Sequence, residues 1–283
     1  MTEPQDIWLV ANPASGSNDD DALNALSDRC ERAGLCLTRK IAFPDEDLPT
    51  PAELDAAGIG TIAVFAGDGT INALVTALDG WGGAVLVLPG GTMNLLSIRL
   101  HGPRSSEEIV DAVVTGDARR VRLSTVRCGD HMALAGLLAG PATAWGDVRE
   151  AMRDLDVPAM VGETVEAVSE STEGAHVHCS EPAAGRAEGY PLLMLTPEDG
   201  NFSVKGYYAE GIVDYARQGL AILRRNFREG PHDDLGNFTT MLATSDNGTA
   251  IPLLVDGERQ DGAAQLRFTL GACGVDLIAT GAS

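Results

Sequence analysis

The turn Ala66-Gly67-Asp68-Gly69-Thr70 has the composition of a backbone loop that binds phosphate groups, and Asn72 follows two residues later. Its two glycines let the backbone turn tightly and approach a polyphosphate closely. Asp68 would repel an anion there unless it held Mg²⁺ or accepted a proton. Thr70 and Asn72 can bind phosphate or cap a following helix. The simpler interpretation is a capped turn in which Asp68 bonds its own backbone.

Two other turns have a similar character. The segment Asn12-Pro13-Ala14-Ser15-Gly16 follows the first apolar run, and Pro89-Gly90-Gly91-Thr92-Met93-Asn94 follows a later one. Each could present backbone N–H groups to an anion at the start of a helix. Taken singly, each is also an ordinary loop between a strand and a helix, with a simple cap at Thr92 or Asn94 in the second case. All three turns are unlikely to occur together by chance, and we expect them to line one edge of a sheet.

Two carboxylate–glycine pairs occur later in the chain. Asp256-Gly257-Glu258 follows a strand-like run and places two carboxylates around a glycine. The same Asp-Gly pair is also a strong signal for a type I′ hairpin. The same applies to Glu210-Gly211, shortly after Tyr207, where a carboxylate precedes a glycine.

Alternating strand-like and helix-like segments position the three turns. We expect strands at 7–11, 35–43, 59–65 and 84–88, and helices at 18–34, 70–78 and 105–115, the last with Ser105 as its N-cap. This alternation predicts an α/β domain with a parallel sheet and helices on both faces. Ligands of such sheets bind beyond the carboxyl ends of the strands, where the three turns lie.

The pattern changes near residue 120 to short β-prone runs separated by turn signals, which predicts an antiparallel β-sandwich domain. We expect residues 1–122 to form a nucleotide-binding α/β domain and residues 123–283 a sandwich that holds the substrate. The expected strands are 121–127, 131–138, 163–169, 175–179, 190–196, 238–244, 251–255, 264–270 and 275–280, with helices at 144–155 and 212–227.

Composition excludes several classes of protein. Forty-one acidic and twenty basic residues give a formal net charge of −21, which opposes binding to nucleic acids. No run reaches the ~18 apolar residues of a transmembrane helix, and the acidic N-terminus is not typical of a signal peptide. We therefore expect a cytoplasmic protein. The five scattered cysteines are expected to be buried thiols, because no pair has metal-site or redox spacing.

Taken in order, the motifs NPASG, AGDGTIN, PGGTMN and VDGER resemble those of the diacylglycerol kinase-like lipid kinases, a family that includes bacterial diacylglycerol kinases and sphingosine kinases. The resemblance runs from about residue 7 to 280. It implies an ATP-dependent kinase with an α/β domain for ATP and a β-sandwich domain for the lipid. It also implies Mg²⁺, a lipid acceptor such as diacylglycerol, and access to the membrane surface. The oligomeric state is left open, a homodimer included.

The resemblance implies roles for individual residues. Glu258 would accept the proton of the lipid hydroxyl, and Asp256 would orient it or join a metal–water network. Asp68 would lie near the γ-phosphate, through Mg²⁺ or as the base itself. The nucleotide would contact Asn12, Pro13, Ser15, Gly16, Ala66, Gly67, Asp68, Gly69, Thr70, Asn72, Gly91 and Thr92. A structural Mg²⁺ would be held by Glu210 together with the backbone of Tyr207 and Ile212.

Three positions depart from the family pattern. Ala66 replaces a glycine, Ala73 replaces a frequent glutamate, and Glu210 replaces an aspartate. Two other functions therefore stay open. An NAD kinase shares the GDGT turn, although the DGE motif argues against it, and a catalytically weak nucleotide- or lipid-binding regulator could keep the same fold.

Overall fold

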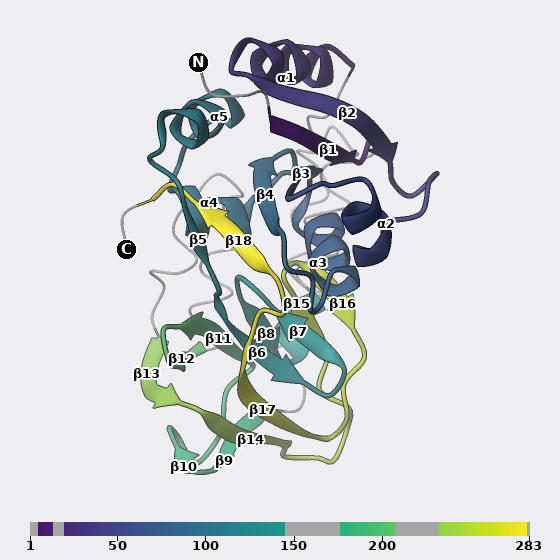
Figure 1. Cartoon of the computed structure of the whole chain (residues 1–283). Helices are drawn as coiled ribbons and strands as arrows, with labels where there is room; N and C mark the ends of the chain where they lie inside the picture. Colours follow the sequence, from purple (N-terminus) through teal and green to yellow (C-terminus); the bar gives the residue numbers. More distant parts are fainter. Residues whose placement is uncertain (1–4, 14–19, 145–175, 208–231, 282–283) are drawn as a thin grey trace, which may run out of the picture. The chain divides into compact units, whose positions relative to one another are not determined.

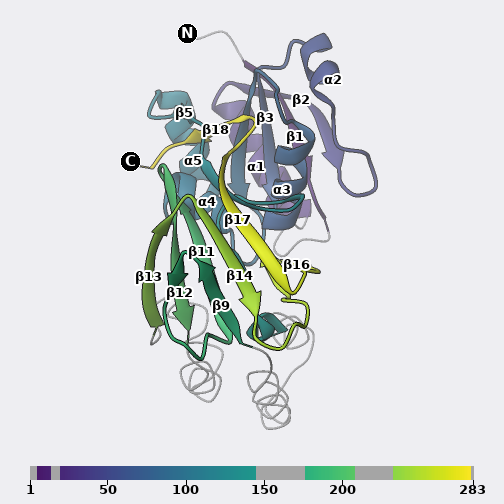
Figure 2. The same cartoon turned by 90° about the horizontal axis from the view of Figure 1, so that it is seen from below.

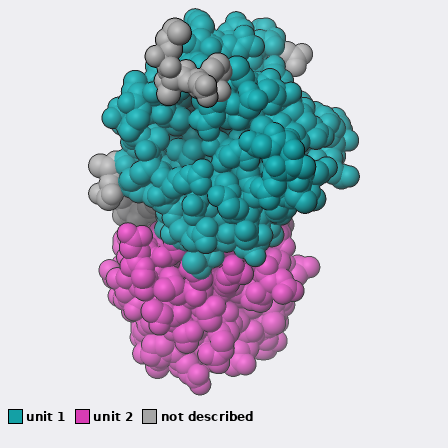
Figure 3. Space-filling model, in the orientation of Figure 1, with its two compact units in different colours: residues 1–123, 272–283 teal, residues 124–271 magenta. Residues whose placement is uncertain are grey.

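The computed structural model describes residues 5–13, 20–144, 176–207 and 232–281 (Figure 1). The chain divides into two compact units, Met1–Leu123 with Ala272–Ser283, and Ser124–Gly271 (Figure 3). The division expected from the sequence, with everything after residue 122 in one domain, therefore needs a correction. The last segment returns to the first unit.

The first unit is built on one six-stranded sheet with the strand order β2-β1-β3-β4-β18-β5. Its elements are β1 (Gln5–Ala11), α1 (Asp20–Arg32), β2 (Leu35–Ala42), α2 (Pro51–Ala56), β3 (Thr61–Ala66), α3 (Asp68–Ala77), β4 (Ala84–Pro89), α4 (Leu95–His101), α5 (Ser106–Thr115), β5 (Arg119–Val121) and β18 (Asp276–Ala279).

The predicted α/β architecture is confirmed. Strands β1 to β4 and β18 pair in parallel, and only β5 pairs antiparallel, with β18. Every residue of β3 is buried, so both faces of the sheet are covered. Helices α1 and α5 pack on one face, where Leu26, Cys30, Ile109 and Val110 join one apolar cluster with strand residues. Ser105 caps α5 in a capping box, as the sequence predicts.

Strand β18 is held in this sheet partly by a buried histidine at the end of α4. The Nε2 of His101 lies 2.9 Å from the carbonyl oxygen of Val87 and must donate to it, so Nδ1 accepts from the Thr280 hydroxyl at 2.9 Å. Burial lowers the pKa of His101 to about 4, because imidazolium loses its hydration there. The neutral ring joins α4 to β4 and to the residue after β18.

The second unit contains two six-stranded sheets, with the orders β10-β9-β14-β17-β6-β7 and β13-β12-β11-β8-β15-β16 (Figure 2). Its elements are β6 (Ser124–Cys128), β7 (His131–Ala133), β8 (Leu137–Ala139), the 3₁₀ helix η1 (Pro141–Ala144), β9 (Val177–Glu181), β10 (Ala183–Ala184), β11 (Leu192–Glu198), β12 (Asn201–Tyr207), β13 (His232–Phe238), β14 (Thr240–Ser245), β15 (Leu253–Val255), β16 (Glu258–Gln260) and β17 (Gln265–Ala272).

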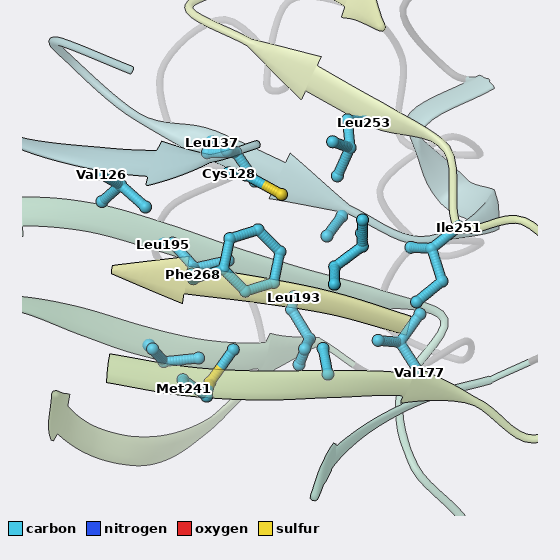
Figure 4. Packing of buried hydrophobic residues seen from close by; sticks show 14 of the residues in the cluster. Val126, Cys128, Leu137, Val177, Leu193, Leu195, Met241, Ile251, Leu253 and Phe268 are labelled. Atoms are coloured by element: carbon cyan, nitrogen blue, oxygen red, sulfur yellow. The ribbon is translucent and has the colours of Figure 1, made fainter. Parts of the chain in front are cut away.

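The predicted antiparallel sandwich is also confirmed. The pairs β10–β9, β9–β14, β14–β17 and β6–β7 of one sheet and the five pairs of the other run antiparallel. The two sheets share one core, in which Leu193 and Leu253 from one sheet face Met241 and Phe268 from the other (Figure 4). The expected strand 163–169 and the helices 144–155 and 212–227 lie outside the described residues, except for Ala144.

The expected strand 131–138 is wrong as a single strand. It is interrupted at Leu134–Gly136, so that β7 belongs to one sheet and β8 to the other. The buried carboxylate of Asp256 explains the interruption, because it accepts the backbone N–H groups of Leu134, Ala135 and Gly136 at 2.7, 2.8 and 3.0 Å. A side chain thus replaces the strand hydrogen bonds where the chain crosses between the sheets.

The cysteines are free, and four of them are buried, as expected, whereas Cys36 is partly exposed. Burial raises the pKa of Cys30, Cys128 and Cys179 to about 11, which keeps these thiols protonated. No helix in the described parts of the chain is long and apolar enough to cross a membrane.

The neutral His101 predicts a specific pH dependence. Its pKa rises from about 4 in the folded state to about 6.5 in the unfolded state, so the unfolded state binds more protons between these values. Stability from this group is present above pH 6.5 and is lost as the pH falls. We expect the free energy of unfolding to fall by about 3 kcal/mol more between pH 7 and pH 4 than in His101→Gln, whose amide does not titrate. Equal pH dependences in the two proteins would contradict this arrangement.

The Asp256 carboxylate predicts a large loss of stability on truncation. Asp256→Ala leaves three backbone N–H groups without their acceptor, at about 1–3 kcal/mol each. We expect a loss of at least about 3 kcal/mol in the second unit, measured by urea unfolding with amide exchange in β8. Asp256→Asn, which keeps one acceptor oxygen, should lose less, and the exposed control Asp261→Ala almost nothing. If the free energy of unfolding of Asp256→Ala equalled that of the wild type, this role of Asp256 would be refuted.

Candidate active site

Three turns meet at the carboxyl edge of the first unit's sheet. Strands β1, β3 and β4 are neighbours in parallel, with Ala11 opposite Phe65 and Ala66 opposite Pro89. The turns that follow these strands therefore emerge side by side, which confirms the alignment expected from the sequence. This edge is where ligands of parallel sheets usually bind.

The first turn is joined to the second by a side-chain hydrogen bond. Asn12 Nδ2 donates to Thr70 Oγ1 at 3.0 Å. Thr70 is almost fully buried, and because its oxygen accepts from Asn12, its own hydrogen points elsewhere. Pro13 is exposed, whereas Ser15 and Gly16 lie outside the described residues.

The second turn leads directly into α3. Gly67 is the N-cap residue, in an extended conformation, and as a glycine it has no side chain with which to cap the helix. The N–H groups of the first turn of any helix lack acceptors inside the helix, and here they belong to Asp68, Gly69 and Thr70. By contrast, α2 and α5 both begin with complete capping boxes. The N-terminus of α3 therefore has the properties that favour an anion.

Two other residues of this motif lie in regular structure. Ala66 is the buried last residue of β3 and is not among the described residues with positive φ, so an alanine fits where the family has a glycine. Asn72 lies inside α3, and its Oδ1 accepts from the Thr76 hydroxyl at 3.3 Å. Its side chain therefore does not cap the helix.

The third turn approaches the second at backbone distance. A Cβ on Gly91 would lie 2.5 Å from the Cα of Gly67, so only glycine fits at position 91. The Gly90 N–H donates to the carbonyl oxygen of Ala66 at 3.3 Å. Asn94 closes the turn, because its amide accepts from Gly91 N and donates to Gly91 O, both at 2.8 Å. The N–H groups at 90 and 91 are thus used within the protein, and the exposed residue at the tip is Thr92.

The carboxylate of Asp68 accepts hydrogen bonds from the backbone at the start of α4, the helix that follows the third turn. Its Oδ2 accepts the N–H of Leu95 at 3.0 Å, and its Oδ1 accepts the N–H of Leu96 at 3.1 Å. These are the first two residues of α4, so the carboxylate caps that helix from a distance. The sequence did not indicate this contact, since Leu95 and Leu96 carry no polar side chain.

The Asp256-Gly257 pair forms the two-residue hairpin between β15 and β16. Val255 pairs with Glu258, and Asp256 and Gly257 have φ of 48° and 93°, as a type I′ turn requires. The hairpin interpretation is therefore correct for the local structure. Asp256 is buried, whereas Glu258 is exposed at the start of β16.

The expected metal position falls mostly outside the described residues. Glu210 and Ile212 are not described, and Tyr207 ends β12 with its ring buried beside Met194. Among the residues that the structure describes, no three His, Cys, Asp or Glu side chains are grouped so that they could hold a metal ion.

Comparisons with known proteins give a consistent result. Residues 6–126 match the model of the diacylglycerol kinase catalytic domain. No curated protein matches the chain.

Three similar solved structures come from Bacillus anthracis str. Sterne. Two are named as a "putative diacylglycerol kinase", with TM-scores of 0.62 and 0.59 at 15% and 14% identity, and they cover 99% and 98% of this chain and 96% and 97% of those chains. One named as a diacylglycerol kinase has a TM-score of 0.60 at 13% identity and covers 99% of this chain and 98% of that chain.

At such identities the likeness to solved structures shows the fold alone, and the family assignment rests on the match at residues 6–126, which contain all three turns. The match identifies residues 6–126 as similar to a diacylglycerol kinase catalytic domain, and together with the shared fold it supports a diacylglycerol kinase-like lipid kinase family.

Proposed function

We propose that this protein is an ATP-dependent lipid kinase that transfers the γ-phosphoryl group to the hydroxyl of diacylglycerol. The observation that carries the proposal is the position of the N-terminus of α3, which begins after a glycine N-cap at the carboxyl edge of a parallel sheet between two further turns. The family of residues 6–126 supports a kinase over other phosphate-binding proteins.

The phosphates of ATP would be held by the first turn of α3. Gly69 and Thr70 would offer N–H groups, and the Thr70 hydroxyl, oriented by Asn12, would add a donor. Thr92 would contribute from the exposed tip of the third turn. Phosphoryl transfer depends mainly on positioning and on charge neutralisation. Hydrogen-bond donors held in fixed positions at the carboxyl edge of the sheet would contribute to both.

The Mg²⁺ that accompanies ATP would neutralise phosphate charge. The described residues hold no cluster suited to that ion, and both oxygens of Asp68 accept backbone N–H groups. We keep Glu210 with the backbone of Tyr207 and Ile212 as the proposed metal position and derive no catalytic step from it.

Glu258 is the proposed proton acceptor for the lipid hydroxyl. A carboxylate within hydrogen-bond reach of the acceptor is the minimum requirement for such a base. Glu258 is exposed and stands next to a tight turn, which limits its movement. Asp256 would orient it indirectly, because its buried carboxylate fixes the turn to the backbone of residues 134–136.

The direct test is the transfer of ³²P from [γ-³²P]ATP to a panel of diacylglycerol, a sphingoid base, ceramide and NAD. We expect labelled phosphatidic acid from diacylglycerol. Labelling of NAD would identify an NAD kinase instead. ATP binding without transfer to any lipid would identify a regulator that has lost turnover, and either result would refute the proposal.

The base assignment makes its own prediction. Glu258→Gln removes the proton acceptor but keeps the shape of an exposed side chain, so kcat should fall by roughly 10²–10⁴-fold. The KM for ATP and the unfolding free energy should stay at wild-type values. Glu198→Gln, an exposed change at the end of β11, is the matched control and should keep full activity. A kcat near wild type for Glu258→Gln would remove Glu258 from the mechanism.

A further inference from the structure

The two hydrogen bonds from α4 to Asp68 define what this carboxylate does in the fold. Asp68 is the first residue of α3, yet its two oxygens accept from the first two residues of another helix, at 3.0 and 3.1 Å. Since each oxygen takes one N–H, the carboxylate fixes both the distance and the orientation of α4. Its negative charge also lies at the positive end of that helix dipole.

Helix α4 does not cap itself. The residue at its N-cap position, Asn94, has φ of 51° and ψ of 41°, and its side chain makes no bond to the helix. That side chain instead closes the third turn onto Gly91. The other helices of this unit with described N-terminal caps, α2 and α5, use Glu53 and Glu108 from their own first turns. The cap of α4 is therefore the one that connects two separate turns.

This cap acts on the phosphate-binding edge because α4 begins where the third turn ends. The turn from Gly90 to Asn94 is closed by its own asparagine, which is also the N-cap residue of α4, so the turn and the helix are directly connected. On its other side it touches Gly67 at backbone distance and bonds to Ala66. We therefore expect Asp68 to fix the position of Thr92 relative to the first turn of α3.

The same bonds disfavour proton transfer to Asp68. A neutral carboxyl group accepts hydrogen bonds more weakly than a carboxylate, so protonation would weaken both contacts with α4. A general base at this position would loosen the site in each catalytic cycle.

We propose that Asp68 is a positioning residue, which holds the third turn and α4 against the phosphate-binding turn of α3 and does not accept the proton of the acceptor hydroxyl. The inference rests on the proposed kinase function, and it assigns the proton to a different carboxylate, Glu258. Loss of Asp68 should therefore weaken ATP binding more than it slows the chemical step.

The variants Asp68→Asn and Asp68→Ala separate the two roles. Asparagine keeps one acceptor oxygen for α4, whereas alanine keeps none, so we expect a graded effect. The KM for ATP should rise by about tenfold or more in Asp68→Ala and by less in Asp68→Asn, with the pH profile of kcat unchanged in shape. A proton acceptor would behave differently, because both variants would lose kcat equally at an unchanged KM and the acidic limb of the profile would disappear.

Glu108→Ala is the control, because it also removes a carboxylate that accepts a backbone N–H at the start of a helix, here the N–H of Ser105 before α5. It should cost similar stability and leave the KM for ATP unchanged. If it raised the KM as much as Asp68→Ala does, the effect would be general destabilisation, and the positioning role would be refuted.

Amide hydrogen exchange tests the inference independently of catalysis. Exchange at Leu95 and Leu96 should become about tenfold faster or more in Asp68→Ala and should be unchanged in Glu108→Ala. Wild-type exchange at both amides in Asp68→Ala would overturn the inference even in an active kinase. Conversely, a wild-type protein that transfers no phosphate to any lipid would refute the proposed function. In that case, faster exchange at Leu95 and Leu96 and weaker ATP binding in Asp68→Ala would still support the positioning role of Asp68.

Discussion

The turns after β3 and β4 approach each other so closely that a methyl group on Gly91 would lie 2.5 Å from the Cα of Gly67. Most features of the candidate site follow from this contact. Parallel pairing of β3 and β4 brings the two turns together. Asn94 closes the turn after β4, whose backbone then contacts the turn after β3. Asp68, the residue after Gly67, then holds α4 in place because its carboxylate accepts the N–H groups of Leu95 and Leu96. The result is an edge with two turns in backbone contact, from which α3 begins directly after the glycine at its N-cap.

Helix α4 is held at both ends, and its far end depends on the last strand of the chain. His101 bonds to Val87 and Thr280, and the carbonyl oxygen of Leu100 accepts the N–H of Thr280. Strand β18 lies between β4 and β5, so the sheet that supports the three turns is complete only after the second unit has been synthesised. Local stability at the edge that carries the three turns is therefore linked to residues about 180 positions later in the sequence.

Local patterns in the sequence predicted much of the fold and part of the site. The strands before the three turns, the Ser105 cap and the Asp-Gly hairpin each depend on neighbouring residues, and all are present. Contacts between distant residues were not predictable. The partners of Asp68 are backbone groups 27 and 28 residues away, and α4 itself has only seven residues after an asparagine with positive φ. The apolar run of β18 fits either kind of sheet, and the break at 134–136 is imposed by Asp256, more than 100 residues later.

The central claim is that ATP phosphates bind at the first turn of α3. Backbone ¹H–¹⁵N shifts during a titration with MgATP test it most directly, because each N–H group of the three turns reports separately. The account predicts the largest shift changes at Gly69 and Thr70, and smaller ones at Gly90 and Gly91, whose N–H groups already have acceptors within the protein. Saturable ATP binding that leaves Gly69 and Thr70 unshifted would contradict it.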